Sequence, residues 1–135
     1  MEHQRKLVYS NRMPIRWGDQ DAMGHVNNTV YFRYMEQTRI EWLESLGFGT
    51  SVTMEQGPVI VNASCTFLLP FTYPDDIDCR MFCGQPGRSS VPTYYEMRVA
   101  GEDRLYAEGA AKLVWINPGT GKSIPLPELM RAACL

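Results

Sequence analysis

Polar side chains able to do chemistry gather in one short stretch, which reads GDQDAMGHVNN. It contains two carboxylates, Asp19 and Asp21, one imidazole, His25, and two adjacent amides, Asn27 and Asn28. A carboxylate can act as a general base or as a nucleophile, and an imidazole can move protons near neutral pH. The stretch therefore holds the groups that a hydrolytic site requires.

The residues after this stretch predict an amphipathic helix of about 19 residues, roughly 28 Å long. Its apolar arc holds Tyr31, Tyr34, Met35, Thr38, Trp42 and Leu46. Ile40 alone is apolar on the opposite side, which indicates a partner surface, and Gly47 predicts the end of the helix. A helix start offers free N–H groups and a positive dipole end, which suit a developing oxyanion. We expect the Asp21 carboxylate to face this helix start across a gap that holds the substrate.

Other uses of closely spaced aspartates fit less well. Asp19, Asp21 and Gly24 occupy the first, third and sixth positions of a calcium loop, but Met23 and Val30 stand where oxygen ligands belong. An aspartate-nucleophile phosphatase requires a doubly wound sheet, which the order of elements does not give. The simplest alternative is that these residues only cap the helix and shape the turn. Their clustering favours a functional site.

The composition indicates one domain over residues 1–135, since the length suits a single core and 44% hydrophobic with 21% charged residues is typical of folded chains. A net charge of −2 predicts no nucleic-acid partner and no membrane insertion. The first residues have no apolar signal core, so we expect a cytoplasmic protein. The cysteines lack the spacing of a zinc site, so we expect reduced thiols and no metal, and no residue pattern calls for a cofactor. They are Cys65, Cys79, Cys83 and Cys134.

The predicted elements are a strand, the helix and then four strands, a pattern of the α+β class. The first strand covers residues 6–16, where Pro14 indicates an edge position or a bulge. A connector without clear period, residues 50–57, follows the helix. The later strands cover residues 58–69, 77–83, 91–99 and 104–116, and a short last helix follows Pro127. The links between these strands are too short for parallel crossovers, so the sheet must be largely antiparallel with the helix across it.

The opening motif resembles a family signature. It runs Arg16-x2-Asp19-x-Asp21-x2-Gly24-His25-Val26-Asn27-Asn28-x2-Tyr31-x2-Tyr34-x-Glu36-x2-Arg39. This is similar to the hotdog-fold acyl-CoA thioesterases of the 4-hydroxybenzoyl-CoA thioesterase family, and the likeness continues through the Pro70 turn to the tail from Thr120. The resemblance implies a hotdog fold, a five-stranded antiparallel sheet wrapped around one long helix. It also implies homodimers, often paired into homotetramers, with active sites at the dimer interface.

The resemblance assigns roles to individual residues. Asp21 corresponds to the catalytic carboxylate, which attacks the thioester carbonyl or activates a water that does so. The backbone N–H of Asn28 corresponds to the donor that holds the thioester oxygen, and we expect Asn27 and Tyr31 to bind the substrate. The loop after the third strand meets the CoA phosphates in relatives, which implies this role for Arg88, Ser89 and Ser90.

His25 and Glu36 have less defined roles. The plant acyl-carrier-protein thioesterases share the His-Val-Asn-Asn run and use the corresponding histidine in catalysis, whereas many bacterial relatives lack it. We expect His25 to order the loop or line the substrate pocket, with catalysis as its second role. Glu36 lies on the polar side of the helix, which predicts a salt bridge to Arg33 or Arg39.

These residues predict hydrolysis of an acyl-CoA to free acid and CoA. A thioester is already activated, because a thiolate leaves readily, the pKa of a free cysteine thiol being about 8.5, so one carboxylate and one oxyanion donor can be enough. An acyl-carrier-protein thioesterase, a hotdog hydratase and a non-catalytic acyl-CoA-binding module are the alternatives. The hydratase would need a longer Asp/His motif, and the presence of Asp21 argues against the binding module.

Overall fold

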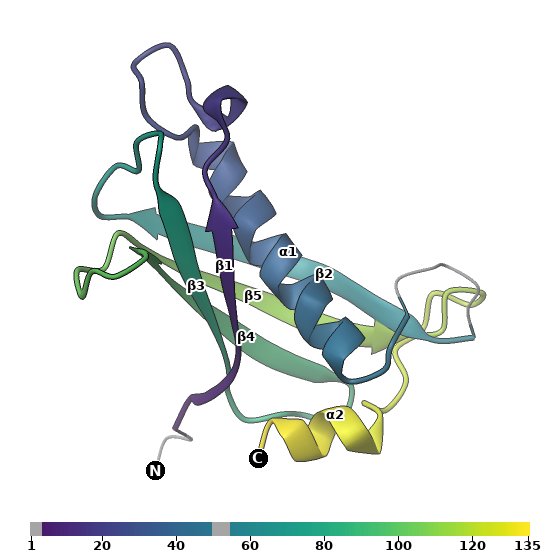
Figure 1. The fold of residues 1–135 in the computed structure, drawn as a ribbon. Coiled ribbons are helices and arrows are strands. Elements are labelled where there is room, and N and C mark those ends of the chain that lie inside the picture. Colours follow the sequence, from purple (N-terminus) through teal and green to yellow (C-terminus); the bar gives the residue numbers. More distant parts are fainter. Residues whose placement is uncertain (1–3, 50–54) are drawn as a thin grey trace.

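The computed structural model describes residues 4–49 and 55–135. Its elements are β1 (Lys6–Pro14), the 3-10 helix η1 (Trp17–Asp19), α1 (Asn28–Ser45), β2 (Gly57–Phe67), β3 (Asp76–Cys83), β4 (Ser90–Val99), β5 (Ala107–Ile116) and α2 (Glu128–Ala133). The strands form one antiparallel sheet in the order β1-β3-β4-β5-β2. Figure 1 shows α1 lying across this curved sheet. The predicted α+β architecture, five strands wrapped around one long helix, is confirmed.

The helix α1 begins and ends at signals present in the sequence. Asn27 is its N-cap, and its side-chain oxygen accepts a hydrogen bond from the Thr29 N–H at 2.9 Å. At the other end Gly47 has a φ of 89°, and the N–H groups of Gly47 and Phe48 bond back to carbonyls of the last turn at 2.9 and 3.0 Å. These are the two bonds of a Schellman motif, so Gly47 ends the helix as predicted. No helix in the described part of the chain has the length and apolar character to cross a membrane.

The apolar face of α1 packs on the concave face of the sheet. Its buried residues are Tyr31, Tyr34, Met35, Thr38, Trp42 and Leu43. The prediction included Leu46 instead of Leu43, and Leu46 is half-buried at the helix end. Ile40, expected to mark a partner surface, is also half-buried and packs against the core of its own chain.

The strand bounds differ slightly from the predicted ones. Pro14 ends β1, which lies at one edge of the sheet, as predicted. The last strand begins at Ala107 instead of residue 104, because the Tyr106 carbonyl accepts from the N–H groups of Leu68 and Leu69, at 2.9 and 3.0 Å, where the chain turns into the sheet. Residues 50–54 of the predicted connector lie outside the described residues.

The pairing of β1 with β3 shows at which end of the sheet each of two loops lies. Lys6 pairs with Cys83 and Pro14 pairs with Asp76, so the loop after β1 and the loop after β3 lie at opposite ends. Figure 1 shows the first of these loops at the upper end and α2 at the lower end. The start of β1 and the C-terminus also lie at the lower end, where Lys6 donates to the Leu135 carbonyl at 3.1 Å.

Candidate active site

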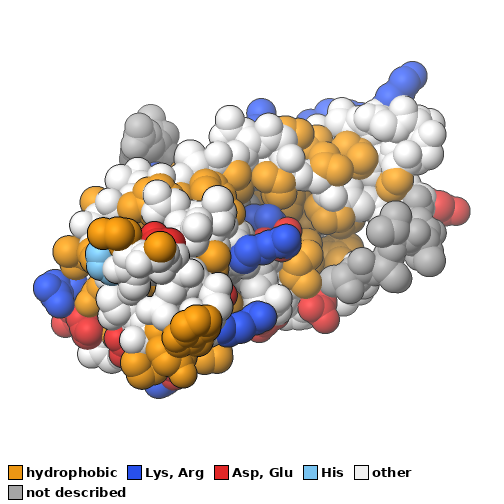
Figure 2. All heavy atoms as spheres, turned by 90° about the horizontal axis from the view of Figure 1, so that it is seen from above, with side chains coloured by type: hydrophobic (Ala, Val, Ile, Leu, Met, Phe, Trp, Pro, Cys, Tyr) orange, Lys and Arg blue, Asp and Glu red, His pale blue; other side chains and the backbone are white. Residues whose placement is uncertain are grey.

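The predicted polar stretch forms a small hairpin directly before α1. Gln20 and Val26 make an isolated antiparallel bridge, and the Asp21 N–H donates to the His25 carbonyl at 2.7 Å. Gly24 closes the tip with a φ of 79°, a conformation that favours glycine. The hairpin presents Asp21 and His25 to solvent at the end of the molecule that Figure 2 views from above. Hydrophobic side chains are exposed on this end among the charged ones.

The carboxylate of Asp21 has one oxygen held by the hairpin. Its Oδ1 accepts from the backbone N–H groups of Met23 at 2.8 Å and of His25 at 3.3 Å. Its Oδ2 makes no hydrogen bond within the described residues. Burial raises the pKa of the Tyr31 phenol, and the nearby charge of Asp21 adds to that rise. One oxygen of the Asp21 carboxylate is therefore without a partner among the described residues, in the hairpin that leads directly into α1.

At the start of α1, Asn27 caps the helix and the backbone N–H of Asn28 is a free hydrogen-bond donor. The side-chain oxygen of Asn27 accepts from both the N–H and the hydroxyl of Thr29, at 2.9 and 2.8 Å. Asn28 is the first helical residue, it is exposed, and its N–H finds no acceptor in residues 4–49 or 55–135. A free N–H at the positive end of a helix suits a developing oxyanion. The substrate contact expected of Asn27 stays a prediction.

The second carboxylate, Asp19, is bound into the fold. Its Oδ2 accepts from the Arg16 N–H and from the Tyr34 hydroxyl, both at 2.9 Å, and its carbonyl accepts from the Asn27 N–H at 2.9 Å. Burial and the hydrogen bond to Asp19 raise the pKa of the Tyr34 phenol well above its ordinary value. Sequence reasoning counted Asp19 among the chemical groups and missed this link, because the two residues lie 15 positions apart.

Tyr31, expected to bind the substrate, lies in the core below the hairpin. Only 2% of it is exposed, and its ring packs against Phe67 and Phe71 at centroid distances of 4.8 and 5.5 Å. The Phe71 carbonyl in turn accepts from the Val26 N–H at 2.9 Å. Tyr31 thus supports the base of the hairpin, and its contact with a substrate stays a prediction.

The loop with Arg88, Ser89 and Ser90 lies at the other end of the sheet. Arg131 of α2 donates to the Arg88 carbonyl at 3.1 Å, and the Trp115 N–H donates to the Ser89 carbonyl at 2.8 Å. The Arg88 side chain is exposed. A single chain therefore does not bring this loop to the hairpin.

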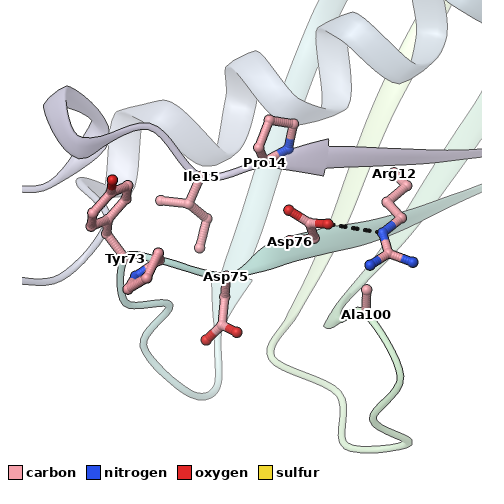
Figure 3. Close-up of a pocket in the computed structure, with 8 residues that line it drawn as sticks. Arg12, Pro14, Ile15, Tyr73, Asp75, Asp76 and Ala100 are labelled. Carbon is pink, nitrogen blue, oxygen red and sulfur yellow. Dashed lines mark hydrogen bonds and ion pairs between the residues drawn. The ribbon is translucent and has the colours of Figure 1, made fainter.

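Two hollows border the end of β1. One, of about 430 Å³, lies between β1 and the start of α1 and is lined in part by Asp19 and Tyr34. Figure 3 shows the other, of about 520 Å³, where Arg12 pairs with Asp76 at 3.0 Å and Asp75 points away from that pair. Asp21 lines neither hollow. Asp21 and Asn28 are both exposed, and the gap expected to hold the substrate between them stays a prediction.

Three further charged side chains of α1, Arg33, Glu36 and Arg39, have partners within the chain. Glu36 forms an ion pair with Arg33 at 2.9 Å, one of the two predicted pairs. Arg39 instead donates to the Tyr95 hydroxyl at 3.0 Å. Among the described residues no three His, Cys, Asp or Glu side chains are grouped so that they could hold a metal ion.

Comparison of this sequence with known protein families shows the family to which the chain belongs. Residues 15–134 match the thioesterase-like superfamily. The chain belongs to this superfamily. A relative from Aquifex aeolicus (strain VF5), named "Putative esterase", is 31% identical over 121 residues, which cover 88% of this chain and 91% of the relative.

Solved structures agree with this membership. The PA2801 protein from Pseudomonas aeruginosa is 35% identical with a TM-score of 0.92, over 96% of this chain and 100% of that one. The BH1999 gentisyl-coenzyme A thioesterase is 28% identical with a TM-score of 0.82, over 93% of this chain and 98% of that one. These likenesses confirm the hotdog fold and support thioester hydrolysis in general. The narrower 4-hydroxybenzoyl-CoA thioesterase family stays a prediction.

In this thioesterase-like protein the hairpin and the start of α1 together offer two complementary groups. Asp21 provides a carboxylate oxygen that can accept a proton or attack a carbonyl carbon. Asn28 provides a backbone N–H that can hold an oxygen as it gains negative charge. That pair matches what hydrolysis of an activated acyl group requires.

Proposed function

We propose that this protein hydrolyses acyl-CoA thioesters to the free acid and CoA. Asp21 acts through Oδ2, either as general base on a water molecule or as the nucleophile. The Asn28 N–H donates to the thioester oxygen as the tetrahedral intermediate forms. The C–S bond then breaks, the thiolate leaves and is protonated, and water supplies the new oxygen of the acid. The observation that carries the proposal is the free, exposed N–H at the start of α1, next to the Asp21 hairpin.

One carboxylate and one oxyanion donor are enough to catalyse thioester hydrolysis. One preorganised oxyanion donor typically lowers the barrier by about 3 kcal/mol, and a positioned general base adds about 100-fold or more in rate. The leaving thiolate needs little help from an acid, because thiols are fairly acidic, with a pKa of about 8.5 for free cysteine. His25, exposed beside Asp21, can order the hairpin or share in proton transfer.

A homodimer formed through β2 would complete the site. β2 is an edge strand and most of its residues are exposed. Its Phe67 end packs against Tyr31 below the hairpin, whereas at its other end Pro58 pairs with Trp115, next to Ser89. Two β2 strands paired antiparallel would bring the Phe67 end of one chain to the Pro58 end of the other. Arg88 of the partner subunit would then approach the Asp21 hairpin.

The test is a thiol-release assay over a panel of acyl-CoA chain lengths. We expect Asp21→Asn to lower kcat at least about 100-fold, the scale of a lost general base. Asp103→Asn, a change at an exposed carboxylate in the β4–β5 turn, is the matched control and keeps the wild-type rate. Equal rates for the wild type and Asp21→Asn would reject the mechanism. Release from none of the esters would favour a non-catalytic acyl-CoA-binding module.

A second experiment determines whether the acyl group is carried by CoA or by acyl-carrier protein. The same acyl chain is offered on CoA and on acyl-carrier protein, and kcat/KM is measured for both. We expect the CoA ester to be preferred. A clear preference for the carrier protein would make the acyl-carrier-protein thioester the substrate and keep the chemistry at Asp21. Pairing of dimers into tetramers and a cytoplasmic location stay predictions.

A further inference from the structure

We propose that Asp19 and Tyr34 form a clamp that positions the Asp21 hairpin against the start of α1. This inference rests on the proposed hydrolysis and adds two positioning residues to it. The Tyr34 hydroxyl and the Arg16 N–H both donate to Oδ2 of Asp19, each at 2.9 Å. One carboxylate oxygen thus joins the chain after β1 to the second turn of α1.

The backbone of Asp19 extends the same link to the oxyanion donor. Its carbonyl accepts from the Asn27 N–H at 2.9 Å, one residue before Asn28. Asp21 follows Asp19 by two residues on the other side. A shift of Asp19 therefore moves the carboxylate and the N–H relative to each other. Catalysis is sensitive to such shifts, because a misplacement of about 1 Å can cost about 100-fold in rate.

The hydrogen bond, more than packing, holds Asp19 in place. Asp19 is only half-buried, and both Asp19 and Tyr34 border the hollow of about 430 Å³ between β1 and α1. Without the hydroxyl, the Asp19 carboxylate has room to turn into this hollow. The Tyr34 ring is only 6% exposed, so a phenylalanine would keep its packing. A hydroxyl donating to a carboxylate is a strong, charge-assisted hydrogen bond.

The chain contains a matched control for this clamp. The Tyr9 hydroxyl of β1 donates to the Glu41 carboxylate of α1 at 3.3 Å. This is the same type of bond, a phenol donating to a carboxylate, and it also joins α1 to the chain before it, but it lies in the later part of the helix. Tyr9→Phe therefore removes a phenol–carboxylate link without touching the hairpin.

The kinetic test compares the two phenylalanine variants on the best acyl-CoA substrate. We expect Tyr34→Phe to lower kcat at least about tenfold with KM within about twofold, because the reacting groups are misplaced while the binding surface remains. Tyr9→Phe keeps both constants. Asp19→Ala loses kcat as Tyr34→Phe does, and Asp19→Asn regains part of it because its amide oxygen still accepts. Equal kcat for Tyr34→Phe and Tyr9→Phe would overturn the clamp.

Amide hydrogen exchange tests the clamp without any substrate. We expect the Asn27 and Asp19 N–H groups to exchange faster in Tyr34→Phe than in the wild type or Tyr9→Phe, with the amides of β3 unchanged. If the wild type releases no thiol, the proposed function fails, and the clamp is judged on exchange alone. Unchanged exchange at Asn27 and Asp19 would overturn it.

Discussion

Gly109 of β5 lies so close beneath Met35 of α1 that a Cβ atom at position 109 would overlap the Met35 sulfur. Met35 is fully buried near the middle of the helix. This contact therefore sets how closely α1 approaches the sheet, and through α1 it sets the position of the helix start.

Gly109→Ala should destabilise the fold because the helix must move or Met35 must leave its rotamer. Overpacking of this kind costs about 1–3 kcal/mol, measured as the free energy of unfolding in urea. Gly57→Ala in β2 is the control, since an added Cβ there meets nothing within 4 Å. In a double-mutant cycle, Gly109→Ala should cost less in a Met35→Ala background than in the wild type, because the shorter side chain leaves room for the added Cβ. An equal cost at both glycines would mean that the close approach is not the cause.

Asn27→Ala should lower the free energy of unfolding by about 1 kcal/mol, because the helix loses its N-cap acceptor. Asn28→Ala should change it little, since that side chain does not cap the helix and its backbone N–H remains. Thermal unfolding of the two variants checks the difference. Similar losses at both positions would contradict the assignment of Asn27 as the cap.

The sequence predicted the elements whose signals are local. The helix end at Gly47 and the edge position of Pro14 each depend on a few neighbouring residues, and both are confirmed. Asp19 depends on Tyr34, a partner on another element, so its side chain looked available for chemistry when it is not. Only the folded chain reveals such a link.

Prediction of the site from the sequence was likewise restricted to residues that lie close together along the chain. Asp21, His25 and Asn28 lie in one continuous segment, a hairpin followed by the helix start, and their joint role in catalysis stays a prediction. Arg88 was assigned to the same substrate from resemblance alone, and the pairing of β1 with β3 puts its loop at the opposite end of the sheet. The separation of Arg88 from the Asp21 hairpin depends on how the strands pair, and the pattern of hydrophobic residues in the sequence does not determine that pairing.

Arg88→Ala should raise KM for acyl-CoA and leave kcat nearly unchanged, because a guanidinium on the CoA phosphates contributes to binding in both the ground state and the transition state. Acyl-pantetheine esters lack the nucleotide phosphates, so their KM should not change. Arg104→Ala, at another exposed arginine, serves as the control. Equal effects on CoA and pantetheine esters would exclude a phosphate contact.

Alkaline pH should weaken the fold in a way that Cys79 reports. Burial raises the pKa of the Cys79 thiol from 9.0 to about 12, so above pH 9 the unfolded chain loses a proton that the folded chain keeps. The stabilisation is fully present below pH 9 and is lost as the pH rises towards 12. Cys79→Ala should therefore show a shallower decline in urea midpoint between about pH 8.5 and 10.5 than the wild type. Parallel declines would contradict the raised pKa.

Val61→Lys should dissociate the proposed dimer. Val61 is 59% exposed at the bulge of edge strand β2, and a charge there opposes burial against a second β2 strand. Leu7→Lys is the control, because Leu7 is 50% exposed on the opposite edge strand β1. Light scattering should give a dimer for the wild type and Leu7→Lys and a monomer for Val61→Lys. Thiol release should fall with the dimer, since Arg88 of the partner subunit leaves the Asp21 site; a monomer with full activity would show that one chain suffices.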